Sequence, residues 1–121
     1  MKNLETLVAW KLARDISRRA YRLTMAPPLR RHYSLADQVR RAAASIPANI
    51  CEGYALGTSG QLIRCTRIAL GSASELKCHL ELARDVELVS GSDVDALITA
   101  VERLLGVLVG LLKRLGAKVP S

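Results

Sequence analysis

Aromatic side chains are scarce in this 121-residue sequence, which has one Trp, three Tyr and no Phe. Because strands favour aromatic and β-branched residues, a β-sandwich is poorly supported. Half of the residues are hydrophobic, which excludes intrinsic disorder. Eight Gly and four Pro without a repeat exclude collagen-like and low-complexity chains. We therefore expect one domain of closely packed helices with a core of Leu, Val, Ile and Ala.

Several segments that define other classes of protein are also missing. The cysteines Cys51, Cys65 and Cys78 form no CxxC pair, which argues against a disulfide framework or a zinc site and favours reduced thiols. The most apolar run, residues 104–112, is shorter than the ~20 residues of a spanning helix. The first residues lack the apolar run of a secretory signal. We predict a soluble cytoplasmic protein with no cofactor or metal.

Positive charge is abundant and unevenly distributed. Residues 1–57 contain 10 Lys and Arg residues and 4 acidic residues, which gives +6 of the total net charge of +7. Residues 58–121 contain 8 Lys and Arg residues and 7 acidic residues. A basic half beside a nearly neutral half indicates an anionic partner, most commonly nucleic acid. The alternative is that the charge serves solubility only.

Apolar periodicity predicts four helices, over residues of about 4–24, 34–52, 59–86 and 92–115. The third has a heptad seam from Leu62 to Ala83, which is typical of a helix bundle. The fourth is apolar on nearly every side between residues 104 and 112, which predicts self-association. The predicted core stripe of the first helix consists of Leu4, Leu7, Val8, Leu12, Ile16, Ala20 and Leu23.

Capping residues and glycines mark the predicted helix ends and contacts. Gly71, inside the third helix, indicates close approach of a neighbouring backbone, and Gly106 with Gly110 would admit another helix to the fourth. The predicted N-caps are Ser34 with Asp37, Thr58 or Ser59, and Ser92 with Asp95, and the predicted terminating glycines are Gly53 and Gly116.

Eight basic residues are the candidate nucleic-acid contacts. Four of them recur at a spacing of three and four and so form one stripe along the first helix, which is either a solvated face or a ridge that contacts phosphates. The scarcity of aromatic residues predicts little stacking on bases and weak sequence specificity. The candidates are Lys11, Arg14, Arg18 and Arg22 in the stripe, and Arg30, Arg31, Arg40 and Arg41 beyond it.

A second group of residues is polar and surrounds a proline within the second predicted helix. Ser45, Asn49 and Glu52 share one helical face near Pro47, and Glu75 follows the small residues of the third helix. We interpret them as a structural polar cluster that satisfies a kinked backbone at a helix–helix or subunit contact; the alternative is a functional site. Glu75 can pair with His79 or with an arginine of another helix. No nucleophile or second acid stands at a useful spacing, so we predict no enzyme activity.

Four stretches of the chain carry a resemblance to a known family: LVAWKLA at 7–13, YSLADQVRRAA at 33–43, SIPANICEG at 45–53 and IALGSASEL at 68–76. In combination they resemble the bacterial four-helix proteins associated with intervening sequences in 23S ribosomal RNA genes. A related group includes the accessory variability proteins of diversity-generating retroelements. Cys51, Leu70 and the residues Leu62, Ile63 and Cys65 depart from the pattern.

The resemblance implies an antiparallel up-down four-helix bundle that assembles as a ring-shaped homopentamer. In the retroelement branch it also implies a basic surface that binds RNA or DNA and the reverse transcriptase. The resemblance implies no enzyme activity. We therefore predict a non-enzymatic oligomeric scaffold that binds nucleic acid electrostatically. The alternative is a protein-binding adaptor with no direct role in nucleic-acid binding.

Overall fold

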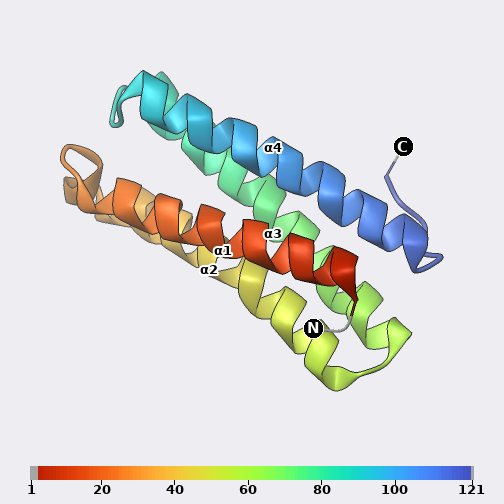
Figure 1. Cartoon of the computed structure of the whole chain (residues 1–121). Coiled ribbons are helices and arrows are strands. Elements are labelled where there is room, and N and C mark those ends of the chain that lie inside the picture. Colours follow the sequence, from red (N-terminus) through yellow and green to blue (C-terminus); the bar gives the residue numbers. More distant parts are fainter. Residues whose placement is uncertain (1–2, 121) are drawn as a thin grey trace.

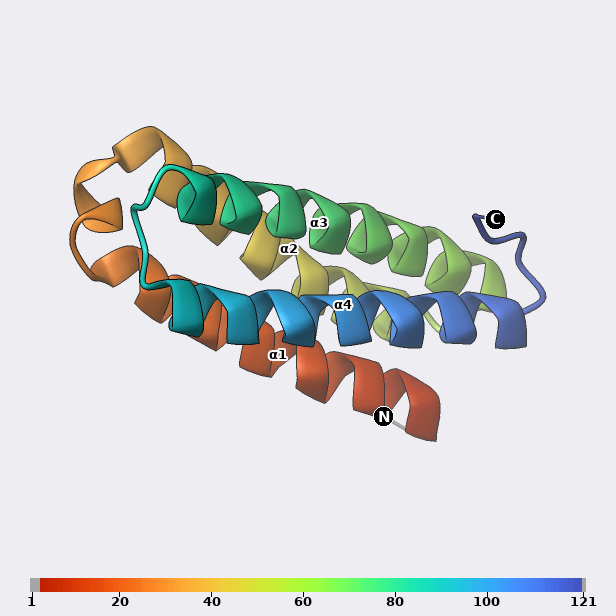
Figure 2. The ribbon, with the colours of Figure 1, turned by 90° about the horizontal axis from the view of Figure 1, so that it is seen from above.

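The computed structural model describes residues 3–120, which form four α-helices and no strand. In Figures 1 and 2, successive helices run in opposite directions, and the α1–α2 and α3–α4 connections lie at the same end. Each helix packs against the next along the chain, and α4 packs against α1. The predicted all-α fold with four helices is confirmed. The elements are α1 (Leu4–Met25), a short 3-10 helix η1 (Leu29–Arg31), α2 (Tyr33–Leu56), α3 (Ser59–Asp85) and α4 (Gly91–Arg114).

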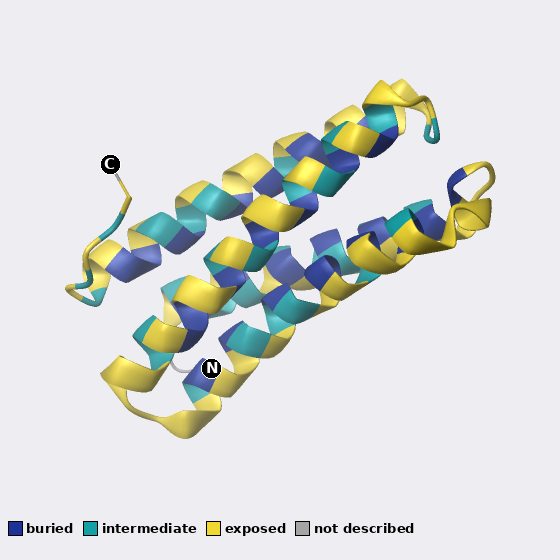
Figure 3. Ribbon diagram, turned by 180° about the vertical axis from the view of Figure 1, so that it is seen from behind, coloured by how far each residue is buried: buried dark blue, intermediate teal, exposed yellow. Residues whose placement is uncertain are grey.

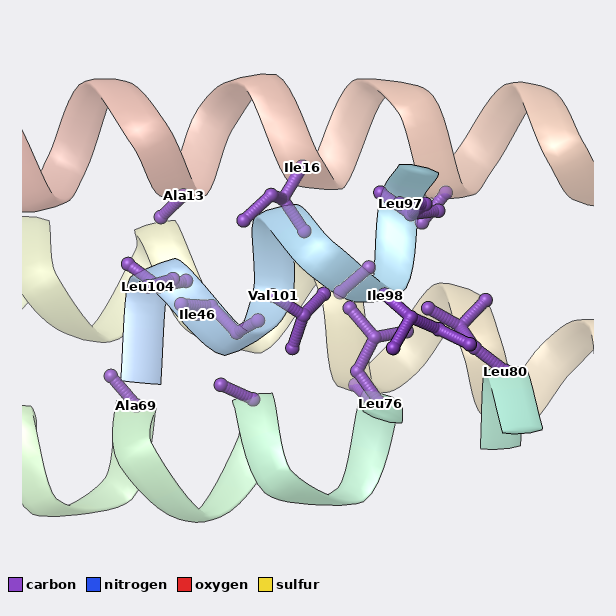
Figure 4. Close-up of a cluster of buried hydrophobic side chains, with 14 of the residues drawn as sticks. Ala13, Ile16, Ile46, Ala69, Leu76, Leu80, Leu97, Ile98, Val101 and Leu104 are labelled. Carbon is purple, nitrogen blue, oxygen red and sulfur yellow. The ribbon is translucent and has the colours of Figure 1, made fainter. Parts of the chain in front are cut away.

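The core lies along the inner faces of the four helices, where the buried residues gather in Figure 3. Figure 4 shows Ile16 of α1, Ile46 of α2, Leu76 of α3 and Val101 of α4 converging on one cluster, and all four are fully buried. The heptad seam of α3 is confirmed, since its positions from Thr66 to Ala83 are buried and Leu62 is half-buried.

The buried face of α1 differs from the predicted stripe. Ala9, Ala13 and Ala20 are fully buried beside Ile16, whereas Leu4 is 72% and Val8 42% exposed. Alanine side chains are short, so they let α1 lie close to its neighbours. The larger leucines of this helix then flank the contact instead of filling it. The prediction was therefore right for Ile16 and Ala20 and wrong for Leu4 and Val8, and it missed Ala9 and Ala13.

Two of the predicted N-caps were also wrong. Helix α2 begins at Tyr33, and its N-cap residue makes no side-chain cap; Asp37 pairs instead with Arg41, at 2.7 Å. Helix α4 follows Ser90, again without a side-chain cap, and Asp95 accepts a hydrogen bond from Arg84 at 3.0 Å. Both carboxylates therefore bind arginines and not backbone N–H groups.

The remaining predicted ends are confirmed at α3 and α4 but not at α2. The Thr58 hydroxyl accepts from the N–H of Gln61 at 3.2 Å, and Gly116 follows α4 with a φ of 79°. Helix α2 continues past Gly53 to Leu56 and ends at Gly57, whose φ is 80°. That positive φ favours glycine, and it ends the helix four residues beyond the predicted end.

Glycine permits a close helix contact at Gly53 and not at Gly71. A Cβ atom on Gly53 would lie 2.8 Å from the Cβ of Cys65 and 3.2 Å from the Cα of Leu62, so α3 packs directly on the α2 backbone there. Gly71 is exposed and a Cβ atom on it would meet nothing within 4 Å. The close approach of helices that the sequence indicated therefore exists, but at another glycine.

The apolar stretch of α4 is mostly used within the chain. Leu104, Leu108, Leu111 and Leu112 are buried, while the other large residues of the stretch are half-buried and its two glycines are exposed. Among residues 3–120, no helix has both the length and the apolar character required to cross a membrane.

Candidate nucleic-acid interface

A groove of about 660 Å³ follows the contact between α1 and α2, and we call it the α1/α2 groove. It combines apolar, aromatic and cationic side chains, and no acidic residue from the described part of the chain lines it. Helix α2 contributes a short segment that includes Pro47 and Cys51. Helix α1 contributes Trp10, Arg14, Arg18, Tyr21, Arg22 and Met25 along one side.

Arginines hold both aromatic rings of the groove in place. The guanidinium carbon of Arg14 lies 4.9 Å from the centre of the Trp10 ring, and that of Arg40 lies 4.6 Å from the Tyr21 ring. Both distances fall within the roughly 6 Å of a cation–π contact. Arg40 also donates through Nε to the buried hydroxyl of Thr24 at 2.7 Å, and that hydroxyl donates to the carbonyl of Tyr21 at 2.6 Å. Arg40 of α2 is thereby fixed to the last turns of α1.

The eight predicted contacts fall into three groups. Arg14, Arg18 and Arg22 line the α1/α2 groove, as the helical stripe requires, whereas Lys11 is exposed outside it. Arg30 and Arg40 share a smaller hollow of about 510 Å³ at the start of α2, beside Tyr33. Arg31 is exposed in η1, and Arg41 is exposed near the start of α2.

Acidic neighbours reduce the charge available on two of these arginines. Arg18 pairs with Asp15 at 2.8 Å, and Arg41 pairs with Asp37 at 2.7 Å. Within residues 3–120, the other six predicted contacts form no ion pair. Because exposed ion pairs contribute little energy, the two paired arginines can exchange their carboxylates for phosphates at small cost.

The predicted polar cluster is divided among three separate contacts. Ser45 of α2 and Ser72 of α3 share a hydrogen bond of 2.8 Å, and the Asn49 amide donates to the Ser45 carbonyl at 2.8 Å. Glu75 lies 3.1 Å from His79 on the same helix, so the local pairing is confirmed. The Ser45 group therefore joins α2 to α3 close to Pro47, which lies inside a continuous helix.

Glu52 belongs to the contact around Cys65, away from the serine pair. The Cys65 thiol donates to a Glu52 carboxylate oxygen at 3.6 Å. Burial raises the pKa of this thiol, Arg64 opposes that shift, and Glu52 adds to it. Cys65 therefore holds its proton more firmly than an ordinary thiol, while Cys51 and Cys78 are exposed. Among residues 3–120, no group of three or more His, Cys, Asp or Glu residues is arranged to hold a metal ion.

Trp10, Tyr21 and Cys51 line the groove but were not predicted from the sequence as site residues. Trp10 and Tyr21 are eleven residues apart, which is about three helical turns and places them on one face of α1. Their spacing with the intervening arginines was therefore a usable signal. Cys51 could not be found this way, because it reaches the groove only through the packing of α2 on α1.

The chain is similar to known proteins in both fold and sequence. A crystal structure of a protein of unknown function from the S23 ribosomal protein family of Bacteroides thetaiotaomicron superposes with a TM-score of 0.82 at 20% identity, covering 91% of this chain and 99% of that one. This likeness shows the four-helix fold alone. No curated protein matches the chain. The sequence profile of the 23S rRNA-intervening sequence proteins matches residues 5–110. The chain therefore belongs to the 23S rRNA-intervening sequence protein family.

Proposed function

We propose that this chain is a non-enzymatic, oligomeric scaffold that binds RNA or DNA through the basic surface of α1, η1 and α2. The observation that carries the proposal is the set of arginines in the α1/α2 groove, which has no acidic lining residue in the described part of the chain. Phosphates supply most of the affinity of proteins that bind nucleic acid through Lys and Arg.

The positions of the charged residues give the proposed surface a direction. Residues 1–57, which include α1, η1 and α2, contribute +6 of the net charge of +7. In α3 and α4 the bases Lys77 and Arg84 pair with Glu102 and Asp95, so that half presents little excess charge. A polyanion therefore meets its complement on the α1 and α2 side.

The expected signature of this function is a steep salt dependence. Replacing Arg14 and Arg22 together with alanine should lower the slope of log affinity against log salt by ~0.7 to 0.9 for each phosphate that the variant no longer neutralises. Fluorescence anisotropy with a labelled oligonucleotide between about 50 and 200 mM salt measures that slope.

The matched control removes the same charge from the other half of the bundle. Arg67 of α3 and Arg103 of α4 are exposed and lie outside the groove, so their joint replacement with alanine should leave the slope within error of the native value. Equal slopes for the native protein and both double variants would show that Arg14 and Arg22 do not contact the nucleic acid. If a partner protein remains bound to the chain after treatment with nuclease and high salt, the adaptor function is favoured instead.

The proposed scaffold is an assembly of copies, for which the family resemblance implies a pentameric ring. A second groove of about 410 Å³ lies between α1 and α4 and is mainly apolar, with Leu4, Val8, Val107 and Gly110 in its lining. Leu4 is 72% exposed in the single chain, which leaves apolar surface that another copy would remove from water.

Sedimentation velocity tests this assembly. The native chain should sediment as more than one protomer at micromolar concentration, and Val8→Glu should shift it toward the protomer because a carboxylate would enter the apolar contact. Ile68→Glu is the control, because Ile68 of α3 is as exposed as Val8, at 41% against 42%, but lies outside this groove. It should leave sedimentation unchanged. A native chain that sediments as a single protomer would rule out the oligomeric scaffold.

A further inference from the structure

We propose that the α1/α2 groove holds unpaired bases of a single-stranded nucleic acid, with arginines on the adjoining phosphates. This inference rests on the proposed function and adds the form of the nucleic acid and the place of its bases. It departs from the low stacking expected from composition, since two of the four aromatic residues, Trp10 and Tyr21, line this groove.

The volume and lining of the groove suit flat, partly apolar rings. Its volume of about 660 Å³ lies within the roughly 300–1,000 Å³ of small-molecule sites. Trp10 is half-buried and Tyr21 is 51% exposed, so both present surface to the groove. Met25 and Pro47 extend this apolar surface at the edges. Bases stack on aromatic rings and on guanidinium planes, and this groove offers both.

Arginines contact both rings in the free chain. Arg14 lies over Trp10, and Arg40 lies over Tyr21 while its Nε bonds to Thr24. Thr24 in turn bonds to the backbone of Tyr21. Holding the contact groups before binding reduces the entropy that the ligand must offset.

The cations of the groove are spaced along the path of a strand. Arg14, Arg18 and Arg22 follow one another at four-residue intervals, hence about 6 Å along the α1 axis. Arg18 uses one N–H group on Asp15 and retains others for a phosphate. In a duplex the bases are stacked on one another and cannot enter, so the groove should prefer single strands.

The test compares an oligothymidylate of about 16 nucleotides and the oligouridylate of equal length with a duplex of the same number of phosphates per strand. Trp10 is the single Trp of the chain, so its fluorescence reports on the groove alone. We expect both single strands to quench it and the duplex to leave it unchanged. Quenching by one single strand alone would still support the inference and would tell RNA from DNA.

Tyr21→Ala should weaken binding of the single strands roughly 5- to 150-fold, which corresponds to removing one base stack, and leave duplex binding within about twofold. Tyr54→Ala is the control, because Tyr54 lines a different hollow, near the end of α2, that contains none of the eight predicted basic contacts. It should leave both unchanged. Because Tyr21 is exposed, Tyr21→Ala should fold like the native chain, which its circular dichroism checks.

Cysteine alkylation supplies a second measurement that needs no variant. Cys51 lines the groove, Cys78 is exposed on α3, and Cys65 is buried. A bound single strand should slow the reaction of Cys51 with N-ethylmaleimide at least severalfold and leave that of Cys78 unchanged. The inference is overturned if the single strands bind no more tightly than the duplex, leave the fluorescence of Trp10 unchanged and do not slow the alkylation of Cys51. If no nucleic acid binds at all, the proposed function itself fails.

Discussion

Replacing Leu76 with alanine is expected to lower the free energy of unfolding by about 2–5 kcal/mol. Leu76 is fully buried in α3 and lies in the central cluster, so its truncation removes apolar burial and leaves a cavity. Urea denaturation followed by circular dichroism, at one fixed protein concentration because assembly affects apparent stability, measures the change.

Leu82→Ala is the matched control for this prediction. It removes the same atoms from the same helix six residues away, but Leu82 is 50% exposed. Changes at such surface positions usually stay within about 0.5 kcal/mol. A similar decrease in stability for Leu76 and Leu82 would contradict the assignment of the α3 seam to the core.

The second large effect is expected at Gly53, where alanine should introduce about 1–3 kcal/mol of steric strain and so destabilise the fold. The added Cβ would lie 2.8 Å from the Cβ of Cys65 and 3.2 Å from the Leu62 backbone, so α2 and α3 would have to separate. This cost exceeds the gain of about 0.5–1 kcal/mol that alanine brings to a helix interior. Thermal and urea unfolding of the variant measure the balance.

Gly71→Ala should change stability in the opposite direction. Its Cβ would meet nothing within 4 Å, so only the helix gain of about 0.5–1 kcal/mol remains. The double variant Gly53→Ala/Cys65→Gly should lose less stability than the sum of the two single variants, because the Cys65 Cβ atom that would clash is absent. The close packing at Gly53 is refuted if Gly53→Ala and Gly71→Ala stabilise the chain equally.

Periodicity predicted the elements of this fold better than it predicted their faces. The third helix has apolar residues at regular heptad positions, so Leu76 and Leu80 were correctly assigned to the core. In α1, Leu4 and Val8 satisfy the same period yet remain exposed, while Ala9 and Ala13 are buried. Whether large or small residues are buried depends on how closely the neighbouring helix approaches. That distance cannot be derived from the sequence of one segment.

The candidate site was predicted only as far as one helix determines it. The stripe of Arg14, Arg18 and Arg22 follows from the geometry of α1, and the ion pair of Arg18 follows from an acid three residues earlier. The groove itself depends on α2, whose Arg40 and Cys51 come to lie beside α1. Contacts between helices are tertiary, so they required the structure.

The uneven division of charge between the two helical hairpins gives the single chain an electric dipole moment across its bundle. Residues 1–57 hold +6, whereas residues 58–121 are nearly neutral. Near a polyanion the molecule therefore experiences a torque that turns α1 and α2 inward before contact, and productive encounters become more frequent. The opposite hairpin, α3 and α4, then faces outward from the complex.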